Sequence, residues 1–341
     1  MPRRGTSQNP GSRFERLHLT WERGEEPAPS TEFLIDRTTS ILTSNKSPDI
    51  GFDWSVNPYR GCEHGCIYCY ARPTHEYLGF SAGLDFESRI LVKSSAPSLL
   101  RQELLSLRWR PRVVAMAGVT DPYQPVERKL RLTRRCLEVL AEVRNPVAVV
   151  TKNHLVTRDI DLLKELSRMD AAHVSISVTT LDVNLQRVME PRTSIPERRL
   201  NAVEQLARNG IPVAVLVAPV IPGLTEHEIP RILTAARDHG AWCCRYQLLR
   251  LPHGVKDLFE EWLRRCFPLR AERVLRRIRE VRSGKLSDSR FHHRMSGEGI
   301  YARQIEQLFT KSSEKLGFRS SLPELSCAAF RRNGQMRLPL G

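Results

Sequence analysis

The segment that decides the fold is Asn57-Pro-Tyr-Arg-Gly-Cys62-Glu-His-Gly-Cys66-Ile-Tyr-Cys69-Tyr-Ala-Arg-Pro73. Its three cysteines have the spacing C-x3-C-x2-C, and the segment directly follows a predicted strand, Asp53–Asn57. In a β/α barrel the chemistry lies at the carboxyl ends of the strands. Gly61 and Gly65 permit a tight loop, because glycine adopts backbone conformations that other residues avoid. The segment therefore predicts a metal-binding loop at the mouth of a sheet built from β/α units.

Two kinds of metal centre suit these cysteines. Three thiolates can bind three irons of a [4Fe–4S] cluster, which leaves the fourth iron open to another ligand. A structural zinc ion requires four ligands, and His64 or His75 would have to supply the fourth. Structural zinc sites usually combine two cysteine or histidine knuckles, and the sequence contains only this one. The cluster is the favoured interpretation, and zinc stays open as the alternative.

Composition narrows the class of protein. Of the 341 residues, 40% are apolar and 27% are charged, which is typical of a globular chain rather than a disordered one. No apolar run approaches the ~18 residues of a membrane span, and the first residues lack the apolar core of a secretory signal. The eight cysteines do not form the paired pattern of a disulfide framework. We expect a cytoplasmic protein with reduced thiols and no membrane partner.

Apolar runs and amphipathic stretches alternate through the middle of the chain. After Asp53–Asn57, the predicted strands are Val113–Ala117, Val147–Thr151, His173–Val178, Pro212–Ala218 and Trp242–Leu249. The helices expected between them are Ser98–Leu107, Arg131–Val143, Arg158–Met169, Arg198–Arg208 and Glu226–Asp238. Continuously apolar strands that alternate with helices predict a parallel sheet covered on both faces. Because a closed eight-stranded barrel requires ~250 residues, we predict an α/β fold with a partial (β/α)6 barrel.

The two ends of the chain differ from this core. Residues 1–46 are expected to form an N-terminal extension that is partly disordered, residues 47–255 the core, and residues 256–341 a helical basic module. Helices are expected at Asp257–Cys266, Leu269–Arg282 and Ala302–Leu316, and the end from Arg319 is expected to be loose. The net charge is +15, and this last module holds 19 basic and 10 acidic residues, a surplus of 9. Such asymmetry favours an anionic partner such as DNA or RNA, with a solvated helix face as the alternative.

The cysteine motif, with Tyr68 before its third cysteine, resembles that of the radical S-adenosylmethionine (radical SAM) superfamily. Residues 47–53, 61–93, 120–125 and 189–192 also resemble a bacterial subfamily similar to spore photoproduct lyase, over roughly residues 33–318. The resemblance implies that Cys62, Cys66 and Cys69 bind a [4Fe–4S] cluster, whose open iron is chelated by the amino and carboxylate groups of S-adenosyl-L-methionine (SAM). Reduction then yields methionine and a 5′-deoxyadenosyl radical that abstracts hydrogen from a substrate. An electron donor such as flavodoxin or ferredoxin is also implied.

The resemblance further implies which residues contact SAM. They are Tyr68 and Ala218 near the adenine, Thr120 and Asp121 near the amino group, Lys152 and Arg199 as cations, and Ser175 and Ser177 near the ribose or carboxylate. This set is chemically sensible, because a zwitterion requires a cation for its carboxylate, an anion for its amine and hydroxyls for its ribose. Turn formation at Asp121 and a solvated helix entry at Lys152 are the structural alternatives.

The substrate is not written in the sequence. Spore photoproduct lyase carries a hydrogen-donating cysteine just before the position of Thr120, where this chain has Gly118 and Val119. Tyr123, Cys243 and Cys244 are candidate catalytic residues, although a free cysteine is commonly a small buried hydrophobe. Three hypotheses follow. The protein is a radical enzyme acting on nucleic acid, a radical enzyme acting on a small molecule or peptide, or a zinc-dependent nucleic-acid-binding module without catalysis.

Overall fold

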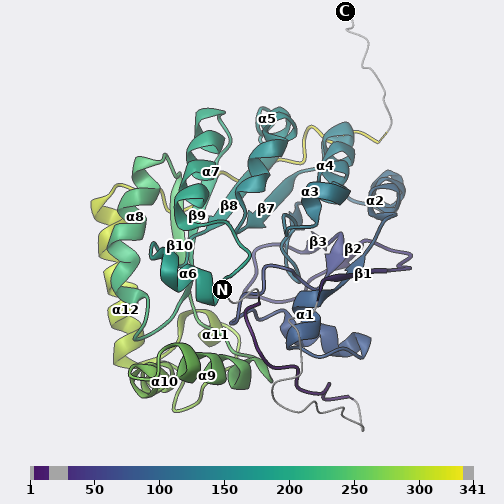
Figure 1. Cartoon of the computed structure of the whole chain (residues 1–341). Helices are drawn as coiled ribbons and strands as arrows, with labels where there is room; N and C mark the ends of the chain where they lie inside the picture. Colours follow the sequence, from purple (N-terminus) through teal and green to yellow (C-terminus); the bar gives the residue numbers. More distant parts are fainter. Residues whose placement is uncertain (1–3, 15–29, 333–341) are drawn as a thin grey trace, which may run out of the picture.

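A computed structural model describes residues 4–14 and 30–332 of the chain (Figure 1). The six predicted strands are present as β3 (Trp54–Val56), β6 (Val114–Met116), β7 (Val147–Thr151), β8 (Ala172–Ser177), β9 (Val213–Val220) and β10 (Cys243–Leu248). They pair in parallel in the order β10-β9-β8-β7-β6-β3, and β2 (Leu42–Ser44) joins β3 antiparallel at the edge. The predicted partial barrel is confirmed.

Five helices cover the outer face of this sheet (Figure 1). They are α2 (Ala96–Leu105), α4 (Leu132–Val143), α5 (Ile160–Ser167), α7 (Pro196–Arg208) and α8 (Ile229–Asp238), all close to their predicted positions. Buried residues recur at helical spacing, for example Leu137 and Leu140 on α4 and Leu163 and Leu166 on α5. These residues pack against the valines and isoleucines of the strands in one continuous core. The helices therefore leave the carboxyl ends of the strands free to carry the site.

A second, smaller sheet was not predicted. It has the order β1-β5-β4, formed by Glu32–Ile35, Arg89–Val92 and Tyr59–Arg60. Its strands have at most four residues, so the period-2 pattern that identifies a strand is too short to read. Three further short elements near it are the 3-10 helix η1 (Arg72–Leu78), helix α1 (Leu84–Ser88) and, on the main sheet, helix α6 (Val183–Met189). Together they surround the cysteine segment.

The described part of the N-terminal segment, residues 4–14, packs against residues 61–88. The amides of Gly5 and Thr6 donate to the Glu87 carboxylate at 2.8 and 3.1 Å, and the Leu84 amide donates to the Gln8 carbonyl at 3.1 Å. An ion pair of 2.9 Å joins Arg13 to Glu76. The sequence pattern, which predicts a partly disordered extension, did not reveal this packing, because the contacts are polar and their partners lie more than 60 residues away. Residues 15–29 lie outside the described ranges.

The C-terminal part is helical, as predicted. It comprises α9 (Val255–Cys266), α10 (Ala271–Glu280), α11 (His293–Ser296) and α12 (Gly299–Lys315). The apolar faces of α9 and α10 form a second core around Trp262, which also reaches α6 and the cysteine segment. The boundaries proposed at 46/47 and 255/256 stay predictions. No helix among the described residues combines the length and apolarity that a membrane crossing requires.

The segment from Arg319 to Arg332 differs from the expected loose end. It runs back across the helical layer, where the amides of Arg319, Ser326 and Arg331 donate to backbone carbonyls of the core at 3.3, 2.8 and 2.9 Å. The Trp242 indole donates to the Ser321 carbonyl at 3.1 Å. The expectation was wrong here because backbone hydrogen bonds of this kind leave no pattern in the side chains.

Candidate functional site

The cysteine loop follows β4 and is built from consecutive tight turns. The amides of Gly65, Cys69 and Arg72 donate to the carbonyls three residues earlier, at 3.2 to 3.3 Å. Gly65 has a φ of +65°, and a Cβ there would lie 2.6 Å from Glu87 Oε2. Only glycine fits such a position, because both the backbone conformation and the space exclude a side chain. These turns direct Cys62, Cys66 and Cys69 into one cavity.

A buried ion pair stabilises the cysteine loop. Arg72 and Glu87 form a salt bridge in which neither side chain is exposed. The Arg72 guanidinium also donates to the carbonyls of Cys66, Ala82 and Gly83 at 3.0 to 3.1 Å. A buried charge is tolerated only when it is paired and hydrogen-bonded, and both conditions are met. Arg72 thus fixes the backbone between the second and third cysteines.

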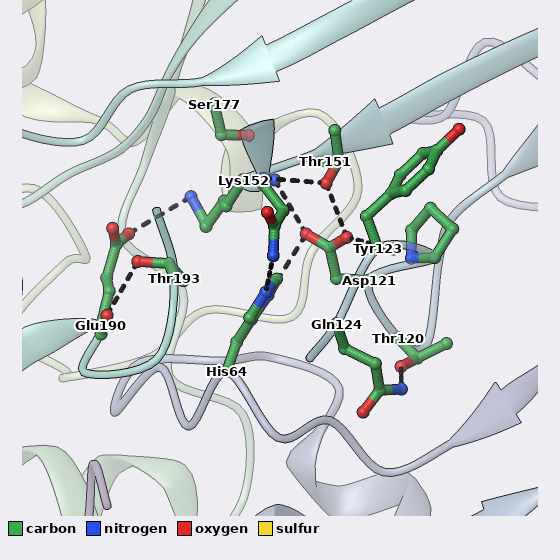
Figure 2. Close-up of polar contacts among 12 residues, drawn as sticks. His64, Thr120, Asp121, Tyr123, Gln124, Thr151, Lys152, Ser177, Glu190 and Thr193 are labelled. Atoms are coloured by element: carbon green, nitrogen blue, oxygen red, sulfur yellow. Dashed lines mark hydrogen bonds and ion pairs between the residues drawn. The ribbon is translucent and has the colours of Figure 1, made fainter. Parts of the chain in front are cut away.

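The end of β6 holds the loop from the front. The Thr120 hydroxyl donates to the Gly61 carbonyl at 2.7 Å, and the Gln124 amide nitrogen donates to that carbonyl at 3.2 Å and to the Thr120 oxygen at 2.9 Å. The Gln124 oxygen accepts the Glu63 amide at 2.9 Å. Figure 2 shows the Gln124–Thr120 contact beside Asp121. Thr120 lines the cavity, but its hydroxyl proton positions the cysteine loop.

Asp121 accepts hydrogen bonds from residues at the end of β7 and after β6 (Figure 2). One carboxylate oxygen accepts the Tyr123 amide at 2.8 Å and the Thr151 hydroxyl at 2.7 Å, and the other accepts the Lys152 amide at 2.8 Å. His64 Nδ1 lies 3.4 Å from the second oxygen. Burial raises the pKa of the Asp121 carboxyl, but His64 and these hydrogen bonds outweigh burial and lower the pKa below its usual value. The residue is therefore a carboxylate that ties β6 to β7 and to the cysteine loop.

The Lys152 side chain extends toward Glu190 (Figure 2). Its ammonium donates to the Ala218 carbonyl at 2.9 Å and to Thr179 Oγ1 at 3.3 Å, and lies 3.4 Å from Glu190 Oε1. It also lies 5.6 Å from the centroid of the Tyr68 ring. Burial, and next the charge of Arg199, lower the pKa of Lys152 to about 8. The Lys152 ammonium thus links Ala218 on β9, Thr179 after β8 and Glu190 after α6. We call these three residues the floor of the cavity.

Glu190 is the buried counter-ion of this cluster. Its carboxylate accepts hydrogen bonds from the Tyr68 hydroxyl and from Thr179 at 2.8 Å, and it forms a buried salt bridge with Arg199. Arg199 also donates to the Ser177 carbonyl at 3.0 Å. Arg199 is 1% exposed and lies behind Glu190. In the described part of the chain it is not among the residues that line the cavity. Its role as a cation for SAM stays a prediction, and the contacts described here are those of a residue that positions Glu190.

The remaining predicted site residues divide into two groups. Tyr68, Ser177 and Ala218 line the cavity, together with the three cysteines, Thr120, Asp121 and Lys152. Ser175, Tyr123, Cys243 and Cys244 lie outside that lining within the described part of the chain. Tyr123 is fully buried and donates to Asp159 at 3.1 Å, and Cys244 packs in the core between sheet and helices. These positions fit structural roles, because Tyr123 completes a buried polar network and Cys244 acts as a small hydrophobe.

Several residues of the site were missed from the sequence. They are Tyr70, Thr179, Pro219, Gln247 and Arg250, which line the cavity or belong to its floor. All except Tyr70 follow or end a strand, so their position in a barrel was the available signal. Tyr70 directly follows Cys69, and its hydroxyl donates to the Gly118 carbonyl at 2.8 Å.

The cysteines fit an iron–sulfur cluster. All three line one cavity, and none forms a disulfide bond in the described structure. The described residues contain no group of three or more His, Cys, Asp or Glu side chains gathered closely enough to bind a single metal ion. A [4Fe–4S] cluster does not require such closeness, since each thiolate binds a different iron. The donor set of three thiols suits a cluster with one iron left for another ligand.

Comparison with known proteins agrees with this geometry. A family model described as the radical SAM superfamily matches residues 56–236. An uncharacterised protein of Mycobacterium tuberculosis is 36% identical over 229 residues, which span 66% of this chain and 67% of the relative. The radical SAM Nα-GlyT isomerase of Pseudomonas phage M6 is 25% identical over 177 residues, 51% of this chain and 34% of the isomerase.

Among solved structures, spore photoproduct lyase complexed with a dinucleoside spore photoproduct has a similar fold. The TM-score is 0.57 at 16% sequence identity, and the match covers 84% of this chain and 79% of the lyase. At this level of identity the similarity concerns the fold, including the partial barrel and the elements around it.

Proposed function

The chain belongs to the radical SAM superfamily, and we propose that its cysteine cavity generates a radical for an attack on nucleic acid. It is a radical SAM enzyme whose cofactors are a [4Fe–4S] cluster and SAM, which the enzymes of this superfamily cleave reductively. The observation that carries the proposal is the convergence of Cys62, Cys66 and Cys69 on a cavity that also contains a cation, a carboxylate and an aromatic ring.

In this proposal Cys62, Cys66 and Cys69 would hold the cluster, which, once reduced by an electron donor, would supply the electron for cleavage of SAM into methionine and a 5′-deoxyadenosyl radical. SAM lies among Tyr68, Asp121, Lys152, Ser177 and Ala218, which line the same cavity. Asp121 and Lys152 keep this wall in place through their hydrogen bonds to protein groups. In this proposal Arg199 acts through Glu190, Ser175 contributes from β8 outside the lining of the described structure, and Thr120 positions the loop.

Three side chains of the cavity are largely shielded from solvent. Cys62 and Cys66 are 6% and 7% exposed, and Tyr68 is 6% exposed. A radical that abstracts hydrogen reacts with whatever it meets, so this shielding favours the intended substrate over side reactions. Enzymes of this superfamily need a reductant, and we propose that a flavodoxin or a ferredoxin supplies the electrons.

Nucleic acid is the substrate class that charge supports. The net charge is +15, and Arg270 and Arg273 are exposed on or beside α10. Other arginines of the same surface, such as Arg264 and Arg277, pair with neighbouring glutamates, which weakens their attraction for phosphate. The relative from phage M6 is named for an Nα-GlyT isomerase and the similar fold belongs to a lyase that binds a dinucleoside photoproduct. A small molecule or peptide is the competing substrate class.

Analysis of anaerobically prepared protein tests the cofactor assignment. We expect about four irons and four sulfides per chain, and loss of the cluster on substituting alanine for Cys62, Cys66 or Cys69. Cys136→Ala is the matched control, because that thiol is fully buried on α4 in the main core. Dithionite-reduced enzyme given SAM should release 5′-deoxyadenosine. Stoichiometric zinc without iron, or a loaded cluster that yields no 5′-deoxyadenosine, would contradict the proposal.

Binding to labelled single-stranded DNA and RNA at several salt concentrations tests the substrate class. Contact with phosphates releases counterions, so affinity should fall steeply as salt rises. The variant Arg273→Gln/Arg276→Gln/Arg277→Gln should bind more weakly and with a shallower salt slope. Equal and salt-insensitive binding by both proteins would favour the small molecule or peptide.

A further inference from the structure

Among the described residues, the guanidinium of Arg250 at the cavity has no carboxylate partner. Arg250 follows β10 and lines the cavity with Tyr70 and Gln247. Its guanidinium donates from Nη1 to Met295 Sδ at 3.7 Å and lies over the Tyr70 ring, whose centroid is 5.3 Å from the guanidinium carbon. Within the described ranges, no Asp or Glu oxygen lies within 4.0 Å of the guanidinium nitrogens.

Asp49, the acidic residue whose charge acts on Arg250, is already paired with other groups. Asp49 forms a buried salt bridge with Arg294 and accepts the His292 amide at 2.7 Å. Arg282, 1% exposed, donates to the Leu249 carbonyl at 2.7 Å and adds another positive charge beside Arg250. Burial first, and then the charge of Arg294, lower the pKa of Arg250, and Tyr70 and Asp49 oppose this only in part. The surroundings of Arg250 are therefore positive, and they lack a free counter-ion.

The other arginines around the site show what is missing. Arg72 and Arg199 are buried, and each contacts a buried carboxylate, Glu87 or Glu190. Desolvating a charge is unfavourable unless an opposite charge and hydrogen bonds compensate. Arg250 is partly desolvated without that compensation, beside an open cavity. A ligand that supplies an oxyanion would complete it.

Tyr70 prepares the guanidinium for such a ligand. Its hydroxyl donates to the Gly118 carbonyl at 2.8 Å, which fixes the ring against the end of β6. A guanidinium held on an aromatic face keeps its forked N–H groups in one plane, the geometry that binds phosphate or carboxylate in a bidentate manner. Because Tyr70 directly follows Cys69, this cation lies at the cysteine end of the chain's reaction cavity.

We propose that Arg250, stacked on Tyr70, binds an oxyanion of the substrate, a phosphate or a carboxylate, inside the cysteine cavity. This inference rests on the proposed function, since it takes the cavity as the place of reaction. The anion belongs to the substrate because the carboxylate of SAM is expected to chelate the open iron of the cluster. Arg250 thereby selects a negatively charged substrate and orients it toward the radical.

The test compares Arg250→Gln and Arg250→Lys with wild type and with Arg245→Gln. Arg245 is exposed on β10, five residues before Arg250 and outside the cavity lining of the described structure, so its variant removes an equal charge close by. The loaded enzyme with SAM is titrated with three probes, namely a fluorescent octathymidylate, inorganic pyrophosphate and succinate. We expect at least one probe to bind wild type and to bind Arg250→Gln about tenfold or more weakly, which reflects loss of a charged hydrogen bond.

Arg250→Lys should retain part of the affinity, and Arg245→Gln should retain all of it. Preferential loss of the nucleotide and pyrophosphate probes identifies a phosphate, whereas loss of succinate identifies a carboxylate. SAM affinity and 5′-deoxyadenosine formation without substrate should match wild type in Arg245→Gln, and Arg250→Gln should lose more affinity for the probe than for SAM. Unchanged probe binding by Arg250→Gln, no binding of any probe by wild type, or an equal loss of SAM affinity would overturn the inference. Failure of the proposed function is separate, since wild type would then form no 5′-deoxyadenosine.

Discussion

The arginines around the cysteine cavity and those on α9 and α10 belong to the same chain but do different work. Arg72 and Arg199 are 0% and 1% exposed and hold the carboxylates that shape the site. Arg264 and Arg265 have half-exposed side chains and pair with glutamates one helical turn away. The density of charged residues along the chain draws attention to the arginines of α9 and α10. Burial shows that the structure depends more on Arg72 and Arg199.

The difference has a simple physical cause. A buried pair has lost its water, so removing one member leaves the other as an uncompensated charge in a poorly polarisable medium. An exposed pair exchanges its partner for water and salt ions with little change in free energy. Substitutions in the two regions should therefore differ in stability and in retention of the cluster.

The largest effect is expected for Arg72→Met. It leaves Glu87 buried and without its cation, so the free energy of unfolding should fall by about 3–5 kcal/mol. Urea denaturation of the apo-protein measures this change, and iron analysis should show loss of the cluster because the loop carbonyl of Cys66 loses its donor. The double variant Arg72→Met/Glu87→Leu should recover part of the stability. If the single variant is as stable as wild type, the loop is held by other contacts.

The next prediction separates two reasons why the cysteine loop requires glycine, namely the lack of space for a side chain and the backbone conformation. Gly65 and Gly210 both have positive φ, +65° and +74°, but a Cβ meets Glu87 only at Gly65, and nothing lies within 4 Å at Gly210. Gly210→Ala should reduce stability by about 1–2 kcal/mol, the cost of the left-handed conformation. Gly65→Ala should reduce stability by about 1–3 kcal/mol more than Gly210→Ala does, because the added methyl group overpacks the loop. It should also reduce the iron content. Equal losses in denaturation curves would show that the loop has room to relax.

A smaller effect is expected for the N-terminal arm, residues 4–14. A Cβ on Gly5 would lie 1.6 Å from the Gly65 carbonyl oxygen, so Gly5→Ala should detach the arm from the loop. Amide hydrogen exchange of residues 61–66 and 84–88 should become about tenfold faster, since local opening costs less free energy. Ser7→Ala, which removes only an exposed hydroxyl contact with Glu261, is the control. Unchanged exchange in Gly5→Ala would mean that the arm does not protect the loop.

The smallest effect is expected on α9. Arg265→Gln removes an exposed pair with Glu261, and the thermal midpoint and iron content should match those of wild type. Thermal unfolding followed by circular dichroism provides the measurement. A loss comparable to that of Arg72→Met would remove the distinction between the two groups of arginines.

The sequence predicted the strands of the barrel well because each is a continuous apolar run. Val147–Thr151 was predicted at its observed ends, and His173–Val178 lies one residue from the observed Ala172–Ser177. The missed elements depend on partners that are distant in the chain. Strand β1 exists because it pairs with β5, and the short helix α6 begins where Asp182 accepts the amides of Asn184 and Leu185. Neither element has a hydrophobic period of its own.

The site divides in the same way. Cys62, Cys66 and Cys69 were identified because eight consecutive residues contain the whole ligand set, and local spacing is visible in a sequence. The SAM contacts of Thr120 and Arg199 stay predictions, whereas the hydrogen bonds of these residues to Gly61, Glu190 and Ser177 are visible only in the structure. Side-chain hydrogen bonds depend on which atoms face each other in space, so spacing along the chain does not predict them.

By itself, the sequence determined the six strands, the helices between them and three thiols on a glycine-containing loop, because each of these is a local pattern. Only the tertiary structure decided which charges are compensated. Glu190 meets Lys152 from 38 positions away in the chain, Glu87 meets the amides of Gly5 and Thr6, and Arg250 meets no carboxylate in the described ranges. The reason is that a charge is stabilised by its neighbours in space, and folding brings those neighbours together from distant segments.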